Sequence, residues 1–346
     1  MTPLLDGMRV LDAGIWRPMP HATQLLADLG ADVCKLEPPG GDPMRAFPDL
    51  FRDVASHKRS VVVDLRTDAG RERALELVAG VDVFSEGWRP GVADRLGLGY
   101  EAVRGVNPSI VYCSISGYGQ TGPLVHQPGH DLNYQSLAGA VAPRYDGDAD
   151  PTIPRVPIAD LAAATVAALL ISAAWAKRVQ TGEGERIDVA MADVIASWVG
   201  PASTTEMRDR TEPVRGSPGY GVFRAADGGF VSIAVISEDH FWQAVCDALE
   251  IPELRALDYG ERLDRIAECN GAVATRIASL SRDVAVQRLA GAGAPVAPVL
   301  MPEESAAHAQ FRSRDVFVDG GDGTTRVAFP ARLSAHPVRA PGPAPE

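Results

Sequence analysis

The chain has 346 residues, of which 46% are hydrophobic and 23% charged, a composition typical of a soluble globular protein. Its length predicts about two domains and is ample for a large buried core. The net charge of −12 argues against a nucleic-acid partner, and four cysteines without C-x-x-C spacing argue against a zinc site or a disulfide framework. Without a membrane-length apolar run or a signal peptide, we expect a cytoplasmic protein with no membrane partner.

Strands and helices alternate over the first part of the chain. We expect strands at 8–12, 31–36, 60–65, 81–85 and 109–116, and helices at 20–29 and 67–78. Strands that alternate with helices indicate βαβ units and a parallel sheet. The sequence therefore predicts an α/β fold for this region.

The second half of the chain has a different character. Residues 161–176 are apolar and alanine-rich, which indicates a buried helix, and the polar, proline-containing residues 200–218 indicate a linker. We expect a hairpin around Asp227-Gly228-Gly229, helices at 241–249, 263–277 and 283–292, a strand at 295–300, and irregular structure from 303 to the end. The predicted domains are a large one at 1–195, completed by 310–346, and a small α+β one at 219–309, joined by a linker at 196–218.

Residues 117–122 spell G-x-G-x-x-G after a predicted strand, as a dinucleotide-binding fingerprint would. That function requires a helix whose N-terminus faces the pyrophosphate. Here Pro123 follows and a loop continues to Gly129, so we interpret the motif as a glycine-rich turn that lets the backbone approach something closely.

One histidine and one carboxylate stand out as groups that carry protons near neutral pH. His130 lies in Pro128-Gly129-His130-Asp131-Leu132-Asn133-Tyr134, and Asp160 ends the segment Val156-Pro157-Ile158-Ala159-Asp160. Such a pair suits removal of a proton from one face of a carbon and its return to the other. The residues alone leave simpler interpretations open: a solvated loop histidine, and aspartates at 131 and 160 that cap the helices following them.

Several motifs spread over nearly the whole chain resemble the family III coenzyme A transferase superfamily, of the CaiB/BaiF type. They lie at residues 3–12, 26–33, 35–39, 63–65, 86–92, 95–97 and 117–123. The resemblance implies a large Rossmann-like domain with a parallel sheet, a smaller α+β domain, and an interlocked homodimer. The active site would then lie between the large domain of one subunit and the small domain of the other.

The superfamily contains two kinds of enzyme. CoA transferases carry the acyl group on an aspartate as an anhydride, whereas α-methylacyl-CoA racemases move only the α-proton. The sequence around His130 is similar to that of the racemase branch, in which the histidine is a catalytic base. Asp160 matches an aspartate that both branches contain. Glu238 is similar to a racemase glutamate that lies near the histidine. The sequence of residues 161–164 resembles that of transferases more than that of racemases. Arg17 stands where the family has small residues, so the Arg17 side chain could pair with a second carboxylate on the substrate.

The resemblance therefore predicts an α-methylacyl-CoA racemase in which His130 and Asp160 exchange protons through an enolate, oriented by Glu238. Donors for the enolate oxygen are expected from backbone amides near Gly129 or at the start of the helix that carries Asp160. The alternatives are a CoA transferase with Asp160 as nucleophile, and a noncatalytic acyl-CoA-binding protein.

The substrate is a coenzyme A thioester, and we expect no metal and no further cofactor. Basic residues in the first part of this acidic chain would contact the CoA phosphates, because arginine and lysine both suit phosphate. We expect CoA to be bound by Lys35, Arg66, Arg89, Asp131 and Tyr134.

Overall fold

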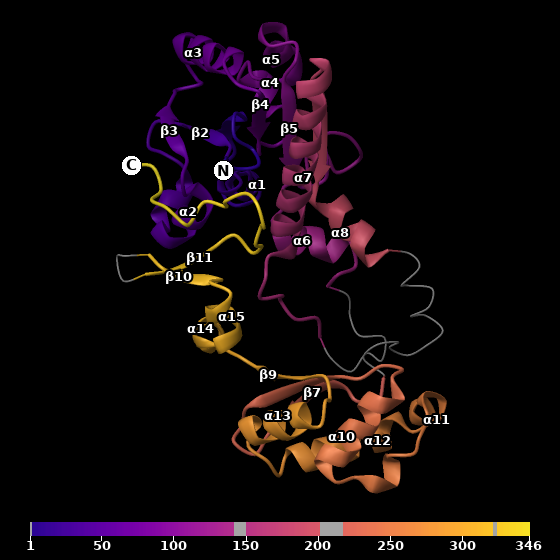
Figure 1. The fold of residues 1–346 in the computed structure, drawn as a ribbon. Helices are drawn as coiled ribbons and strands as arrows, with labels where there is room; N and C mark the ends of the chain where they lie inside the picture. Colours follow the sequence, from indigo (N-terminus) through magenta and orange to yellow (C-terminus); the bar gives the residue numbers. More distant parts are fainter. Residues whose placement is uncertain (1, 142–149, 201–216, 321–323) are drawn as a thin grey trace. The chain divides into compact units, whose positions relative to one another are not determined.

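The computed structural model describes residues 2–141, 150–200, 217–320 and 324–346, and so excludes most of the predicted linker (Figure 1). The described residues form two compact units. Unit 1 comprises 2–141, 150–200 and the C-terminal part from 309, and unit 2 comprises 217–308.

Unit 1 is built on a six-stranded parallel sheet, which confirms the predicted α/β class. Its strands are β1 (Arg9–Ala13), β2 (Asp32–Glu37), β3 (Arg59–Val62), β4 (Val83–Glu86), β5 (Val111–Ser116) and β6 (Glu185–Ala190). The spatial order is β3-β2-β1-β4-β5-β6, so the direction of strand addition reverses between β1 and β4. Ligands of such sheets bind at this reversal, outside the carboxyl ends of the strands.

Helices cover both faces of this sheet (Figure 1). Alternate residues of the strands pack with α1 (Pro18–Asp28) and α7 (Ile158–Thr181) in one hydrophobic cluster, and with α3 (Asp68–Ala79) and α5 (Tyr100–Val106) in another. Strand β5 is buried along its whole length, as a central strand covered on both faces must be. The result is a three-layer arrangement with the sheet in the middle.

The helix α7 is long and apolar enough to cross a membrane by length and composition. In the structure its alanine-rich face is buried in the core of unit 1, where it packs on α1, β5 and β6. Small side chains allow α7 to approach these elements closely, and the core helix of an α/β domain meets the same compositional test.

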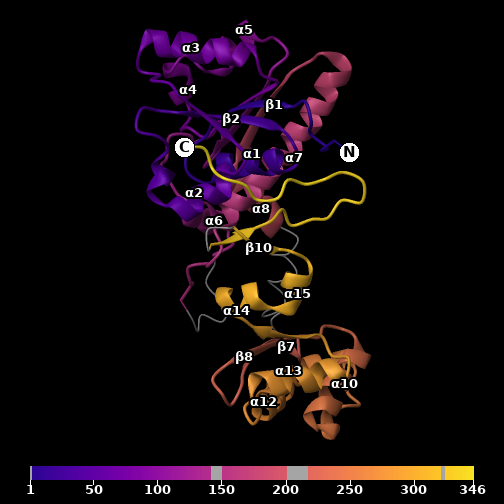
Figure 2. The ribbon, with the colours of Figure 1, turned by 60° about the vertical axis from the view of Figure 1, so that its left-hand side comes forward.

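Shorter elements complete unit 1. They are η1 (Pro43–Ala46), α2 (Pro48–Ala55), α4 (Val92–Arg95), α6 (Asp131–Leu137), α8 (Met191–Val199), α15 (Ala309–Ser313), β10 (Phe317–Asp319) and β11 (Thr325–Val327). The expectation of irregular structure from 303 onward was wrong in part, because α14 (Pro302–Ala307), α15 and the antiparallel pair β10–β11 occur there. The C-terminal tail then runs beside α1 and α2 (Figure 2): the Arg339 N–H donates to the Asp28 carbonyl at 2.9 Å and Gly342 to Ser56 Oγ at 2.7 Å.

Unit 2 is a three-stranded antiparallel sheet packed with helices. The hairpin of β7 (Tyr220–Arg224) and β8 (Phe230–Ala234) confirms the predicted turn, and β9 (Val296–Val299) pairs with β8. The remaining elements are α10 (Asp239–Leu249), η2 (Pro252–Leu254), α11 (Tyr259–Asp264), α12 (Ile266–Ile277) and α13 (Arg282–Gly291), with α14 at its end. The fully buried Trp242 anchors the core, and its Nε1–H donates to the Leu254 carbonyl at 2.8 Å.

Candidate active site

A cavity of about 850 Å³ opens in unit 1 at the carboxyl end of the parallel sheet. Its walls come from the segments that follow four strands: Ile15–Met19 after β1, Gly87–Pro90 and Val92 after β4, Ser116–Tyr118 after β5, and Met191 after β6. The strand order reverses between β1 and β4, and the segments that follow these two strands both line the cavity. The cavity therefore lies where α/β sheets bind their ligands.

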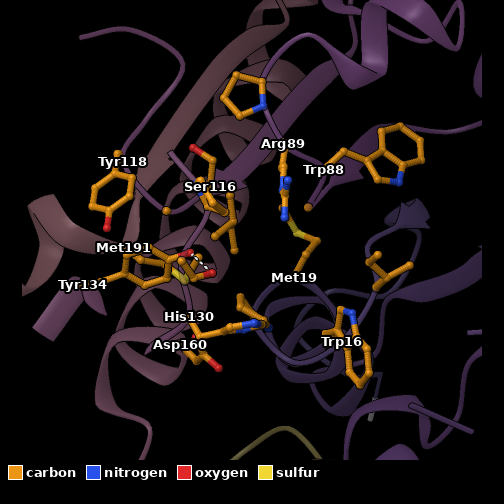
Figure 3. A pocket seen from close by; sticks show the side chains of 18 of the residues that line it. Trp16, Met19, Trp88, Arg89, Ser116, Tyr118, His130, Tyr134, Asp160 and Met191 are labelled. Atoms are coloured by element: carbon orange, nitrogen blue, oxygen red, sulfur yellow. Dashed lines mark hydrogen bonds between the residues drawn. The ribbon is translucent and has the colours of Figure 1, made fainter. Parts of the chain in front are cut away.

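The structure brings His130 and Asp160 to this cavity, and both side chains are among those drawn in Figure 3. His130 is the N-cap residue of α6, and Asp160 lies in the first turn of α7. Asp160 is therefore not the cap of its own helix, whose N-cap residue is Pro157. The interpretation of Asp160 as a helix cap was wrong, which leaves its carboxylate available to the cavity.

Asp131 supplies the missing cap of α7. Its Oδ1 accepts the backbone N–H groups of Ala159 at 2.8 Å and Asp160 at 3.3 Å, and its Oδ2 accepts Nε2 of Gln135 at 2.6 Å. The interpretation of Asp131 as the cap of the helix that follows it was wrong, because His130 occupies the N-cap position of that helix, α6. The two α7 amides that we considered as enolate donors are also occupied by Asp131. Binding of CoA by Asp131 stays a prediction, and the contacts seen are those of a helix cap.

The electrostatics of Asp160 follow from its surroundings. Burial, and secondly the negative charge of Asp131, raise the pKa of Asp160 from 3.8 to about 6, while the positive charge of Arg17 lowers it. Within the described residues the Asp160 carboxylate accepts no hydrogen bond. At neutral pH the carboxylate is mostly ionised.

The G-x-G-x-x-G segment is a turn, as interpreted from the sequence, since no helix begins between Gly117 and Asp131. A Cβ atom at Gly117 would lie 2.5 Å from Cε1 of Tyr134, so glycine is required there by a close approach of the Tyr134 ring. The Tyr134 hydroxyl donates to the Gly129 carbonyl at 2.5 Å. The Tyr134 ring packs edge to face against the Tyr118 ring, with 5.1 Å between the ring centroids. Tyr134 thus fixes the loop ahead of His130 and lines the cavity itself.

The three basic residues predicted to bind CoA have different environments. Arg89 lines the cavity and makes no hydrogen bond or ion pair with any described residue (Figure 3). Arg66 is exposed and pairs with Asp64 at 2.8 Å. Lys35 is buried, pairs with Asp42 at 2.7 Å and donates to the Gly14 carbonyl at 2.7 Å. The placement favours Arg89; binding of CoA by Arg66 and Lys35 stays a prediction that these contacts do not support.

Glu238 lies in unit 2, at the N-cap position of α10. Its Oε2 accepts the Ile236 N–H at 3.1 Å, and hydrogen bonds from the backbone lower its pKa. Its predicted role beside His130 stays a prediction.

Some cavity residues carried no role in the sequence interpretation. Trp16, Tyr118 and Met191 line the cavity directly after the strands β1, β5 and β6. Their position in the sequence could have indicated a place in the site, because side chains that follow parallel strands gather at one edge of a sheet. Trp16 also has a φ of 61°, which is uncommon for a bulky residue and marks a constrained loop.

The fold and cavity define an α/β protein with a ligand site at its strand-order reversal, and comparison with known proteins gives its family. The model of CoA-transferase family III matches residues 5–346. Acetyl-CoA:oxalate CoA-transferase of Acetobacter aceti is 33% identical, over 97% of this chain and 91% of that protein. Succinate–glutarate CoA-transferase of Agrobacterium fabrum is 31% identical, over 99% of this chain and 93% of that protein.

Solved structures agree with the family. A CAIB/BAIF family protein of Brucella suis matches with a TM-score of 0.88 and 28% identity, over 100% of this chain and 97% of that chain. Rv3272 of Mycobacterium tuberculosis matches with a TM-score of 0.88 and 30% identity, over 99% of this chain and 97% of that chain. The chain belongs to CoA-transferase family III and is an enzyme that acts on CoA thioesters.

Proposed function

We propose that this enzyme transfers coenzyme A between carboxylic acids, with Asp160 as the carboxylate that receives the acyl group. The observation that carries the proposal is the Asp160 carboxylate itself, which faces a cavity of about 850 Å³ without a hydrogen-bond partner in the described part of the chain. Asp160 is mostly ionised at neutral pH and so is a competent nucleophile. The names of the relatives described above, both CoA-transferases, favour this function over the racemase predicted from the sequence.

The chemistry needs only groups that the cavity and substrates supply. An Asp160 oxygen attacks the thioester carbonyl, the carbon–sulfur bond breaks, and CoA leaves as a thiolate, which produces an acyl anhydride on Asp160. The thiolate then attacks the aspartyl carbonyl, which releases the donor acid and leaves CoA on Asp160 as a thioester. The carboxylate of the acceptor acid reverses the two steps, so that CoA leaves on the acceptor and Asp160 is regenerated.

The oxyanion formed in each attack requires donors in a site shielded from water. The amides of Ala159 and Asp160 are bonded to Asp131, whereas the Gly129 N–H has no partner among the described residues. We therefore assign oxyanion stabilisation to the Gly129 amide.

The direct test is transfer of CoA to a labelled acceptor acid. Wild-type enzyme with an acyl-CoA donor should form labelled acyl-CoA only when the acid is present, and Asp160→Asn should form none. Acid-independent turnover of the donor, or transfer that survives in Asp160→Asn, would contradict the proposal.

Racemisation of a 2-methylacyl-CoA is the second candidate, and the observation that favours it is His130. This histidine lines the same cavity as Asp160 and stands beside Asp131, which holds the Asp160 backbone. In that reaction the thioester makes the α-hydrogen acidic, His130 removes it from one face, and Asp160 supplies a proton to the other.

Solvent deuterium separates the candidates. A racemase exchanges the α-hydrogen of a 2-methylacyl-CoA without an acceptor acid and loses this exchange in His130→Ala, whereas a transferase does not require the exchange. A noncatalytic binding protein, the third possibility raised by the sequence, would retain acyl-CoA and perform neither reaction.

The remaining predictions from the sequence are carried as proposals. They are the interlocked homodimer, the orienting role of Glu238, the cytoplasmic location, and the domain limits at 1–195 with 310–346, 196–218 and 219–309. The mass of the purified protein in sedimentation tests the proposed dimer. An active site assembled from two subunits requires this dimer.

A further inference from the structure

Arg17 lines the cavity and is a cation without a partner in the part of the chain that the structure describes. It is the N-cap residue of α1 and lines both the 850 Å³ cavity and a second, mostly apolar cavity of about 620 Å³ in unit 1. Its guanidinium makes no hydrogen bond or ion pair with any described residue, and its Nε is buried without a partner. A buried polar group without a partner costs free energy, so this site favours an anion from outside the protein.

Buried charged residues hold the loop that carries Arg17 in place. The Gly14 N–H donates to Oδ1 of Asp12 at 2.9 Å, and its carbonyl accepts Nζ of Lys35 at 2.7 Å. Asp12 in turn pairs with the buried Lys58 at 2.9 Å. These contacts hold the backbone through the uncommon φ of Trp16, a conformation that costs on the order of 1 kcal/mol and persists only where surrounding contacts impose it.

The position of Arg17 relative to Asp160 indicates which anion would bind. Arg17 and Asp160 line the same cavity, and the positive charge of Arg17 lowers the pKa of Asp160, so the two groups lie near each other. In an acyl-CoA the phosphates are separated from the sulfur by the whole pantetheine arm. When the thioester carbonyl is at Asp160, the group near Arg17 is therefore the far end of the acyl chain, and the phosphates need another cation such as Arg89.

We propose that Arg17 binds the second carboxylate of a dicarboxylic acyl group whose thioester carbonyl faces Asp160. This inference rests on the proposed function, because it places an acyl-CoA at Asp160. A guanidinium matches a carboxylate with two parallel N–H donors, whereas a monocarboxylic acyl group of the same length would leave the buried Nε of the half-buried Arg17 unpaired. The site thus selects diacids over fatty acids.

Binding without turnover tests this selection. In an Asp160→Ala background, titration calorimetry compares succinyl-CoA with butyryl-CoA and glutaryl-CoA with pentanoyl-CoA, each pair differing in the terminal carboxylate. We expect tighter binding of the diacid thioester in at least one pair. Arg17→Gln should reduce this preference by about 10- to 100-fold, the usual worth of a charged hydrogen bond, and Arg17→Lys should keep part of it. Arg59→Gln removes one surface charge outside the cavity and should keep the full preference.

The inference is overturned if neither pair shows a preference, if Arg17→Gln leaves the preference unchanged, or if it weakens both members of a pair equally. The last result would show that Arg17 binds the CoA part of the thioester or stabilises the fold. Because no turnover is needed, a protein that selects diacids but fails to transfer CoA would refute the proposed function and leave the role of Arg17 intact.

Discussion

The Oδ1 atom of Asp131 accepts the backbone N–H of Asp160 at 3.3 Å and that of Ala159 at 2.8 Å, so the residue next to His130 caps the helix that carries Asp160. This contact ties the start of α7 to the segment that carries His130. The same negative charge raises the pKa of Asp160, so Asp131 also affects the ionisation of the residue that it positions.

Replacement of Asp131 separates its two effects. Asp131→Asn keeps an oxygen that accepts the α7 amides but removes the charge, so the pKa of Asp160 should fall and the acidic limb of the pH–rate profile should move to lower pH. Asp131→Ala also loses the cap and should lower the free energy of unfolding by about 1 kcal/mol more than the Asn variant. Urea denaturation and pH–rate profiles measure both effects; an unmoved acidic limb in the Asn variant would refute the electrostatic role.

The raised pKa of Asp160 makes stability depend on pH. The pKa is about 6 in the folded protein against 3.8 without the fold, so the folded state binds more protons between these values. Its contribution to the free energy of unfolding is present below pH 3.8 and is lost as pH rises through 6. At pH 7.5 Asp160→Asn should be more stable than the wild type by on the order of 2 kcal/mol, with a smaller difference at pH 4.5. Denaturant unfolding at the two pH values checks this, and an equal difference at both would count against the burial of this charge.

The close approach of Gly117 to Tyr134 predicts the effect of one methyl group. Gly117→Ala would bring a Cβ to 2.5 Å from the ring, so we expect a loss of about 1–3 kcal/mol in stability and a reshaped cavity. Gly105→Ala, in helix α5 with no atom within 4 Å of the new Cβ, should instead be neutral or stabilise by up to about 1 kcal/mol. Thermal unfolding of the two variants gives the comparison, and equal effects would contradict the packing described.

Arg89 should contribute to CoA affinity through its charge. It lines the cavity without a partner in the described residues, so Arg89→Gln should weaken CoA binding by about tenfold at low ionic strength, and by less in high salt, where charges are screened. Arg66→Gln, which removes an exposed arginine paired with Asp64, is the matched comparison and should have the smaller effect. Equal CoA affinity of wild type and Arg89→Gln at low salt would refute the assignment.

The parallel sheet was predictable because apolar strand runs alternate with helical segments in local sequence. The cavity residues His130, Asp160 and Arg89 were found through motifs that resemble a family. Contacts between distant segments were not predictable: Asp131 reaches the start of α7 from 28 positions away, and the C-terminal tail meets Ser56 across 286. Lys35 is predicted to bind CoA from its place among the basic residues of the first part of the chain, whereas its buried pairing with Asp42 depends on tertiary packing that local sequence does not show.

The covalent intermediate on Asp160 is the claim on which the proposed function depends, and hydroxylamine tests it most directly. Enzyme turning over an acyl-CoA and an acceptor acid is treated with hydroxylamine, digested and analysed by mass spectrometry. We expect a hydroxamate on Asp160 that forms only when the thioester is present. An unmodified Asp160 in enzyme that continues to transfer CoA would contradict the account.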